Sequence, residues 1–174
     1  QDRFSLLHEE NGWRIFENKK ALPRAVLAFE YRVFKNNQEF EEFFFAPDFD
    51  PAHTVLLEEE IPAFEKAGTR GQASIVSYSP DTVALTTKSL DDAILFLSDT
   101  YYPGWKAFLD GKATKIYRAN HAFRGVVVPK GDHTVLFSYK PQSYSLGVTI
   151  SGVSVLATVL FLLFLRKWQR MHIR

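Results

Sequence analysis

The sequence predicts a mainly β protein: an antiparallel, jelly-roll-like β-sandwich with one short helix, followed by a C-terminal transmembrane helix. Residues 1–140 contain roughly eight short segments rich in β-forming side chains, separated by turn sequences, which is the spacing of a sandwich. Residues 141–165 then carry no charged side chain. This stretch is long enough to span a bilayer, since a helix needs about 20 apolar residues to cross the hydrocarbon layer.

The first predicted strands are residues 13–17 and 25–34, because aromatic and β-branched side chains dominate both segments. In the second strand, alternation would place Phe29, Tyr31 and Val33 on one face. This predicts one long strand with a single buried face.

Residues 37–45 predict the short helix, because phenylalanines recur there at helical spacing with glutamates between them. Acidic residues near its start suit the positive end of the helix dipole. Asn36 or Asn37 can cap the first turn. We expect this helix to pack on one of the sheets.

The later strands are bounded by clear turn signals. Asp110-Gly111 suits the positive φ angles of a tight hairpin, and residues 129–131 read Pro-Lys-Gly. Residues 93–97 are continuously apolar, which predicts a central strand covered on both faces. Residues 58–71 are expected to be an irregular polar connection. The remaining predicted strands are residues 54–57, 73–78, 82–86, 93–97, 106–109, 114–118, 122–128 and 133–139.

The charge distribution orients the predicted membrane helix. The formal net charge is +1, but all 20 acidic residues lie at or before Asp132, and residues 166–174 are basic. By the positive-inside rule, residues 166–174 are a cytoplasmic tail and residues 1–140 an extracytoplasmic domain of a cell-membrane protein. The absence of cysteine suits that compartment. The alternative is the buried helix of a soluble protein, which seldom runs this long without a charge.

Small side chains form a stripe along the predicted span, at spacings of three and four residues. They are Gly147, Ser151, Ser154 and Thr158. Such a stripe lets other membrane helices approach closely, although a lone anchor is the alternative. The chain also begins with Gln1, and its only methionine is Met171. We therefore expect either a processed chain or a fragment of a polytopic protein.

The sequence carries no recognisable catalytic pattern. It has no glycine-rich phosphate loop and no G-x-S-x-G elbow, and its five histidines lack metal-ligand spacing. We predict no catalytic residue, metal or cofactor here. Scattered basic residues among more numerous acids argue against nucleic acid. A free-standing hydrolase would need Asp99, His121 and His133 to converge in one pocket.

An aromatic segment near the end of the predicted sandwich provides candidate glycan-binding residues. Exposed rings beside polar groups could hold a sugar, whereas buried rings would close the end of the sandwich, with Arg124 bonded to loop carbonyls. Exposure of Tyr102, Trp105 and Arg124 discriminates between these two interpretations. The candidates are Asp99, Tyr101, Tyr102, Trp105, Arg118, Asn120 and Arg124.

The same segment carries a family resemblance. LSDTYYPGWKAFLDGKATKIYRANHAFRGVVVPKGDHTVLFSYKPQSYSLG, residues 97–147, resembles the C-terminal end of the bacterial YfhO-type membrane proteins. ENKKALPRAVLAF, residues 17–29, is similar to the start of their last extracytoplasmic domain. The resemblance implies a polytopic protein related to GT-C glycosyltransferases, which move a sugar from a polyprenyl-phosphate carrier onto an acceptor outside the membrane, here a cell-envelope polymer such as lipoteichoic acid.

In that family relationship, the catalytic carboxylate belongs to an early loop between the first membrane helices, which this sequence does not contain. The resemblance therefore implies a noncatalytic domain that covers the active-site side or helps to select an acceptor glycan. Its expected partners are the lipid bilayer, other transmembrane helices of the parent protein and a cell-envelope glycan. The alternative is a purely structural domain that braces the membrane bundle or recruits a protein.

Overall fold

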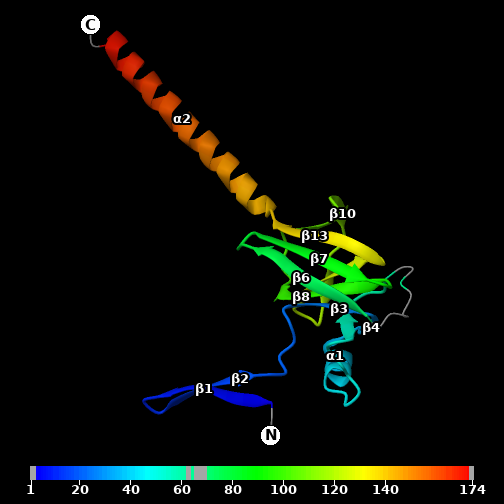
Figure 1. Cartoon of the computed structure of the whole chain (residues 1–174). Coiled ribbons are helices and arrows are strands. Elements are labelled where there is room, and N and C mark those ends of the chain that lie inside the picture. Colours follow the sequence, from blue (N-terminus) through cyan, green and yellow to red (C-terminus); the bar gives the residue numbers. More distant parts are fainter. Residues whose placement is uncertain (1–2, 62–63, 65–69, 173–174) are drawn as a thin grey trace.

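The computed structural model describes residues 3–61, 64 and 70–172. It confirms the mainly β class, with two packed sheets, a short helix and a long C-terminal helix that projects from the sandwich (Figure 1). The described residues form thirteen strands rather than roughly eight, because several of them are only three or four residues long. The predicted connection over residues 58–71 falls partly outside the described residues.

The five-stranded sheet is antiparallel throughout and has the order β10-β9-β13-β7-β6. Its strands are β6 (Gly71–Tyr78), β7 (Thr82–Ser89), β9 (Trp105–Leu109), β10 (Lys112–Thr114) and β13 (Gly131–Tyr139). Asp110 and Gly111 join β9 to β10 with φ angles of 48° and 79°, as the predicted hairpin requires.

The six-stranded sheet has the order β3-β8-β12-β11-β5-β4. Its strands are β3 (Ala25–Ala28), β4 (Glu30–Val33), β5 (Thr54–Leu57), β8 (Ala93–Thr100), β11 (Tyr117–Ala119) and β12 (Phe123–Val128). One pair departs from the antiparallel expectation, since β4 and β5 run parallel. The helix and loop between them form a crossover that brings the chain back in the same direction.

The predicted strand over residues 25–34 is wrong as a single strand. Phe29 separates β3 from β4, and these two lie at opposite edges of the six-stranded sheet. Phe29 packs in the core between the sheets, whereas Tyr31 and Val33 contribute to a second core. Because one residue links the two edges, the sheet must be rolled, and the second core lies inside the roll. The break at Phe29 results from the rolling of the sheet, and the alternation of side chains along one segment carries no information about that rolling.

Strand β8 confirms the expected burial on both faces. Its residues from Ala93 to Leu97 are all buried. Ala93, Leu95 and Leu97 pack between the sheets, while Ile94 and Phe96 point into the second core. A strand with two buried faces needs no polar alternation, which is why it reads as a continuous apolar run.

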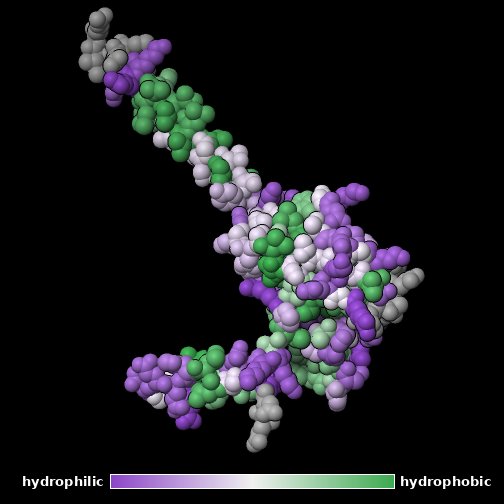
Figure 2. Space-filling model, viewed as in Figure 1, coloured by the Kyte–Doolittle hydropathy of each residue, from purple (hydrophilic) through white to green (hydrophobic). Residues whose placement is uncertain are grey.

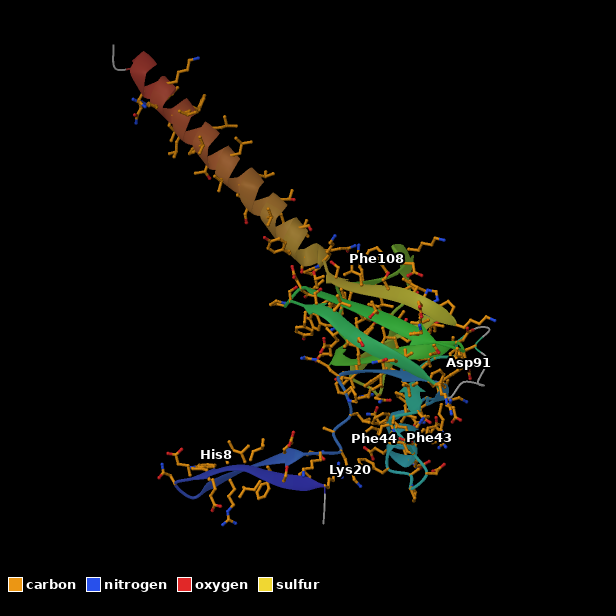
Figure 3. The ribbon with its side chains drawn as sticks, in the orientation of Figure 1. His8, Lys20, Phe43, Phe44, Asp91 and Phe108 are labelled. Atoms are coloured by element: carbon orange, nitrogen blue, oxygen red, sulfur yellow. The ribbon has the colours of Figure 1, made fainter. Side chains whose placement is uncertain are left out.

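Helix α1 (Asn37–Phe44) forms close to its predicted bounds. The Asn36 side chain caps it by accepting a 2.9 Å hydrogen bond from the Glu39 amide, and the Glu39 carboxylate accepts a 2.8 Å bond from the Lys35 amide. The helix lies at the end of the sandwich opposite the long helix, where Phe43 and Phe44 are drawn in Figure 3. Its ring contacts include Phe34 with Phe40 at 5.1 Å.

A separate hairpin of β1 (Phe4–Glu10) and β2 (Trp13–Asn18) extends away from both sheets (Figure 1). Figure 2 shows hydrophobic side chains on it, and Trp13 is 79% exposed. The sequence predicted β2 but not its partner, because β1 ends in a run of polar residues.

Helix α2 (Gln142–His172) is apolar over most of its length, as Figure 2 shows. Residues Gln142–Gln169 pass the length and hydropathy criteria for a membrane span, and the most apolar part of this stretch is not buried against the rest of the described structure. The Ser154 and Thr158 hydroxyls donate to the carbonyls of Ile150 and Ser154, at 2.9 and 2.8 Å. These bonds satisfy the hydroxyls within the helix, as a membrane span requires.

The His133 side chain on β13 contacts the turn of the β9–β10 hairpin. We expect this contact to make the stability of the chain depend on pH. Its Nδ1 lies 2.6 Å from an Asp110 carboxylate oxygen, and this hydrogen bond raises the pKa of His133 above its ordinary value of 6.5. A raised folded-state pKa means that the stabilisation is complete below pH 6.5 and lost as the pH rises through the folded pKa. The free energy of unfolding should therefore fall over that window, as measured by urea denaturation at a series of pH values. His133→Gln should flatten this dependence, and an unchanged slope in that variant would refute the assignment.

Candidate functional site

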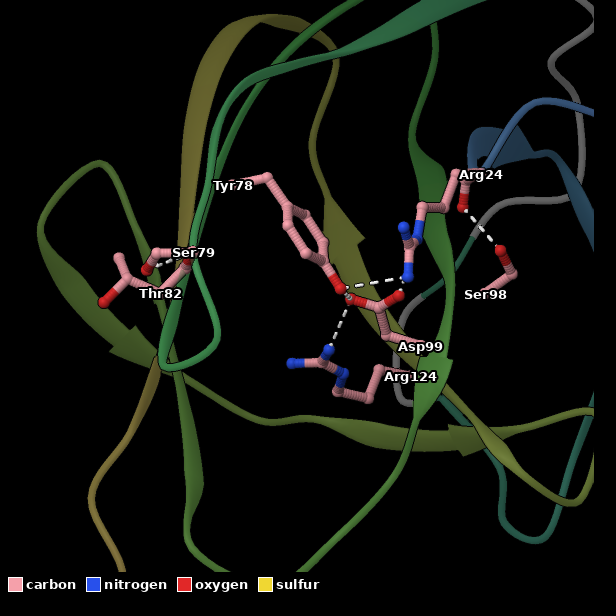
Figure 4. Close-up of polar contacts among 7 residues, drawn as sticks. All are labelled: Arg24, Tyr78, Ser79, Thr82, Ser98, Asp99 and Arg124. Carbon is pink, nitrogen blue, oxygen red and sulfur yellow. Dashed lines mark hydrogen bonds and ion pairs between the residues drawn. The ribbon is translucent and has the colours of Figure 1, made fainter.

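A polar cluster built around the buried side chains of Asp99 and Arg124 lies between the sheets (Figure 4). Asp99 on β8 and Arg124 on β12 face each other, with Arg124 Nη2 2.8 Å from Asp99 Oδ2. Both are buried, at 7% and 2% exposure. A β-bulge between Phe123 and Arg124 shifts the register against β8 and allows this alignment.

Two further residues complete the cluster from the other side. Arg24 donates through Nε to Asp99 Oδ1 at 2.8 Å, and the Tyr78 hydroxyl donates to Asp99 Oδ2 at 3.2 Å. The Tyr78 oxygen in turn accepts a 2.9 Å bond from Arg24 Nη2. Ser98 anchors the backbone of Arg24, because its amide and its hydroxyl both donate to the Arg24 carbonyl. One carboxylate therefore serves three donors.

Aromatic rings enclose the remaining part of the Arg124 guanidinium. Its central carbon lies 3.9 Å from the Trp105 ring centroid and 5.0 Å from that of Phe137. Within the described residues, Arg124 Nε and Nη1 have no hydrogen-bond partner, so ring faces take the place of acceptors. Burial lowers the pKa of Arg124, an effect that the Asp99 charge opposes, while the hydrogen bond to Asp99 raises that of Arg24. Both guanidiniums remain charged, because arginine does not deprotonate in proteins.

Trp105 also lines an open groove of about 450 Å³ on the outside of the sandwich. Tyr101 and Tyr102 contribute exposed rings to this aromatic groove, at 38% and 60% exposure. Its lower wall comes from Ala107 and Phe108 on β9 and from the segment 113–116. Tyr139 supports Trp105 from behind, with ring centroids 5.3 Å apart. The groove therefore has two accessible tyrosines beside a tryptophan held in place by a buried cation.

Gly104 fixes the turn that leads into Trp105. Its φ angle is 108°, and an added Cβ would lie 2.9 Å from the Tyr139 ring and 3.1 Å from the Pro141 backbone. The Gly104 carbonyl accepts a 2.8 Å hydrogen bond from the Lys140 amide. The aromatic loop is thereby attached to the segment that begins α2.

Five of the seven candidate residues thus come together, in two layers: Tyr101, Tyr102 and Trp105 at the groove, Asp99 and Arg124 beneath it. The other two have different partners. Arg118 donates to the His121 carbonyl at 2.6 Å and pairs with Glu58 at 3.3 Å. The Asn120 side chain accepts a 2.8 Å bond from the Leu56 amide and so joins β11 to β5.

Asp99, His121 and His133 contact separate partners rather than one another. Asp99 is occupied by two arginines, His133 pairs with Asp110, and His121 lies 5.3 Å from the Phe40 ring. Among the residues that the structure describes, no group of three or more His, Cys, Asp or Glu side chains could hold a metal ion. The hydrolase interpretation therefore has no geometric support.

Sequence reasoning missed Arg24, Tyr78 and Tyr139. Arg24 lies within the ENKKALPRAVLAF segment that carries part of the family resemblance, but that segment assigns it no role, and Tyr78 ends β6 outside any quoted segment. Arg24 and Asp99 are 75 positions apart in the chain. The only available signal was the unmatched charge of Arg124, which lies in an otherwise apolar strand and needs a partner.

The family model described as bacterial membrane protein YfhO matches residues 50–151. An uncharacterized protein YfhO of Bacillus subtilis (strain 168) is 34% identical over 71 residues, or 41% of this chain. The matched stretch spans only 8% of that relative's length. No solved structure matches the chain significantly.

The matched region contains the aromatic groove, Asp99 and Arg124, and the beginning of α2. It covers more than half of the chain, and the apolar helix α2 gives the chain the membrane segment that the family description requires. The chain therefore belongs to the YfhO family of bacterial membrane proteins.

Proposed function

We propose that residues 1–140 form a noncatalytic extracytoplasmic domain whose aromatic groove helps to bind an acceptor glycan. The parent would be a polytopic protein similar to polyprenyl-phosphate-sugar-dependent glycosyltransferases. The observation that carries the proposal is the exposure of Tyr101 and Tyr102 beside Trp105 in an open groove. Family membership supports a membrane protein, and the GT-C relationship that the YfhO resemblance implies is the basis for the proposed sugar-related role.

The physical basis is that the apolar face of a sugar ring packs on an aromatic ring, while its hydroxyls remain in water. Tyrosine and tryptophan suit such half-wet surfaces because each combines an apolar body with a polar tip. Trp105 is already held between Tyr139 and the Arg124 guanidinium, so binding would immobilise little additional side-chain freedom. The buried cluster would then act through Trp105 without touching the glycan.

The proposed arrangement has residues 141–165 crossing the membrane and residues 166–174 on the cytoplasmic side. It rests on the basic residues after the span and on the absence of acidic residues beyond Asp132. Gly147, Ser151, Ser154 and Thr158 would then face neighbouring helices of the parent protein. An added Cβ on Gly147 meets no other atom of the described residues within 4 Å, which leaves room for a partner helix.

Replacing Tyr101 and Tyr102 together with alanine should weaken glycan binding by about tenfold or more, because hot-spot aromatics at binding surfaces are each worth above about 1 kcal/mol. The measurement is calorimetric titration of the whole chain, in neutral detergent, with deacylated lipoteichoic acid. Phe45→Ala provides a matched control, since Phe45 is 75% exposed beside α1, at the other end of the sandwich. Equal affinity in the tyrosine variant and the control would reject the aromatic groove as a glycan site.

The second candidate function is structural, with the domain bracing the membrane bundle or recruiting a protein. The exposed apolar side chains of the β1–β2 hairpin favour it, because such side chains commonly mark contact surfaces. Under this alternative, the tyrosine variant would bind lipoteichoic acid as the unaltered chain does. Deletion of the hairpin would instead disrupt assembly of the parent protein.

A further inference from the structure

A second groove, of about 360 Å³, lies where the sandwich meets α2. We call it the junction groove; residues 103–106 line one side and residues 140–143 the other. It shares residues 103–106 with the aromatic groove, but its other side is the start of α2. Its two walls are joined by the hydrogen bond from the Lys140 amide to the Gly104 carbonyl.

The junction groove is electropositive. Lys106 and Lys140 both line it and both are exposed, and none of its described lining residues is acidic. The described lysine ion pairs belong to Lys88 and Lys115, so neither groove lysine is neutralised by a described carboxylate. The first turn of α2 contains no acidic side chain to balance its dipole, and the positive end of that dipole adds to the lysine charges.

The position of the groove identifies its occupant. The membrane span begins at Gln142, so residues 140–143 lie at the boundary between water and hydrocarbon. Lipid phosphates occupy that level of a bilayer, and lysine side chains reach it by extending along the interface. The rings of Trp105 and Tyr139 contact each other at the same place in a tilted arrangement, and both suit the interface as amphipathic rings. The groove is therefore continuous with the surface that already meets lipid.

We propose that the junction groove binds the phosphate headgroup of an anionic membrane phospholipid, held by Lys106 and Lys140. This goes beyond the proposed glycan site, since the ligand is different and Lys140 lines the junction groove and not the aromatic groove. The bound lipid would fix the sandwich against the membrane surface, with the aromatic groove opening just above the headgroups. The proposal does not depend on which leaflet supplies the lipid.

The test is native mass spectrometry of the whole chain in neutral detergent, titrated with phosphatidylglycerol or with phosphatidylcholine of the same acyl composition. The basic tail would also attract anionic lipid, so every protein is compared in a background in which the tail is neutral. That background replaces the following residues with glutamine: Arg166, Lys167, Arg170 and Arg174. In it, phosphatidylglycerol should bind at least about fivefold more tightly than phosphatidylcholine.

Lys106→Gln combined with Lys140→Gln should abolish the preference. A matched pair, Lys35→Gln with Lys130→Gln, should retain it, because these exposed lysines lie beside α1 and at the far end of β13. Equal binding of the two lipids by the starting protein would overturn the proposal, as would an unchanged preference in the Lys106 and Lys140 variant. Displacement of the lipid by millimolar inorganic phosphate would also overturn it, by showing a site for free anions.

Discussion

Asp99→Ala should remove about 3–5 kcal/mol from the free energy of unfolding, the range found when one partner of a buried ion pair is deleted. Asp99 is the carboxylate that balances Arg124, whose side chain is only 2% exposed. Without it, the guanidinium would be left charged in an apolar interior, surrounded by aromatic rings and with no described carboxylate to replace Asp99. Urea denaturation of the whole chain in neutral detergent, followed by near-ultraviolet circular dichroism, measures the change.

Arg24→Ala is the matched control, because Arg24 contacts the same carboxylate from the solvent side, with 52% of its side chain exposed. Exposed ion pairs contribute little to stability, so this variant should lose far less than Asp99→Ala. Losses of similar size in the two variants would contradict the view that the buried Asp99–Arg124 contact dominates. Asp99→Ala removes the ion pairs to both Arg24 and Arg124, whereas Arg24→Ala removes only the exposed pair, so the difference between the two losses reports the buried contact.

Gly104→Ala should destabilise the chain by about 2–4 kcal/mol, combining backbone strain with steric displacement. The φ angle of 108° lies in a region that residues with a Cβ rarely adopt. The new methyl group would also lie 2.9 Å from the Tyr139 ring and 3.1 Å from the Pro141 backbone. Relief of these contacts must move the aromatic loop away from the start of α2. Urea denaturation measures the stability, and hydrogen exchange at the Lys140 amide reports the loss of its bond to Gly104.

Gly111→Ala distinguishes the two causes. Gly111 also has a positive φ, of 79°, but an added Cβ would meet no atom within 4 Å. Gly111→Ala should therefore lower the free energy of unfolding by only about 1–2 kcal/mol, the cost of a positive φ angle in a residue with a Cβ. If the two variants lost equal stability, the packing of Gly104 against Tyr139 and Pro141 would have no energetic weight. Faster exchange at Lys140 should be confined to the Gly104 variant.

Local sequence signals predicted the parts of the fold that depend on neighbouring residues. The φ angles at Asp110 and Gly111, the Asn36 cap and the apolar run of β8 all follow from short segments of chain. Alternation failed at Phe29, where the chain leaves one sheet edge and enters the other. No local pattern can report that event, since it depends on how strands distant in sequence close the sheet.

The candidate site also has a part that could be predicted from the sequence and a part that could not. The aromatic residues Tyr101, Tyr102 and Trp105 were identifiable because they are adjacent in sequence and follow a predicted central strand. Their exposure was not identifiable, and neither was the placement of Arg118 and Asn120 at other contacts. Residue type gives the chemistry that a side chain offers, whereas the topology decides which side chains meet.

By itself, the sequence determined the mainly β class, the apolar span that passes the membrane criteria and the family to which the chain belongs. Composition, periodicity and motif order are properties of the amino-acid sequence, so they can be recognised before the fold is known. Only the tertiary structure decided that Arg24 and Arg124 share Asp99, and that Lys106 and Lys140 line one groove beside α2. These contacts join residues remote in sequence, and their existence depends on the rolled sheet and on the turn at Gly104.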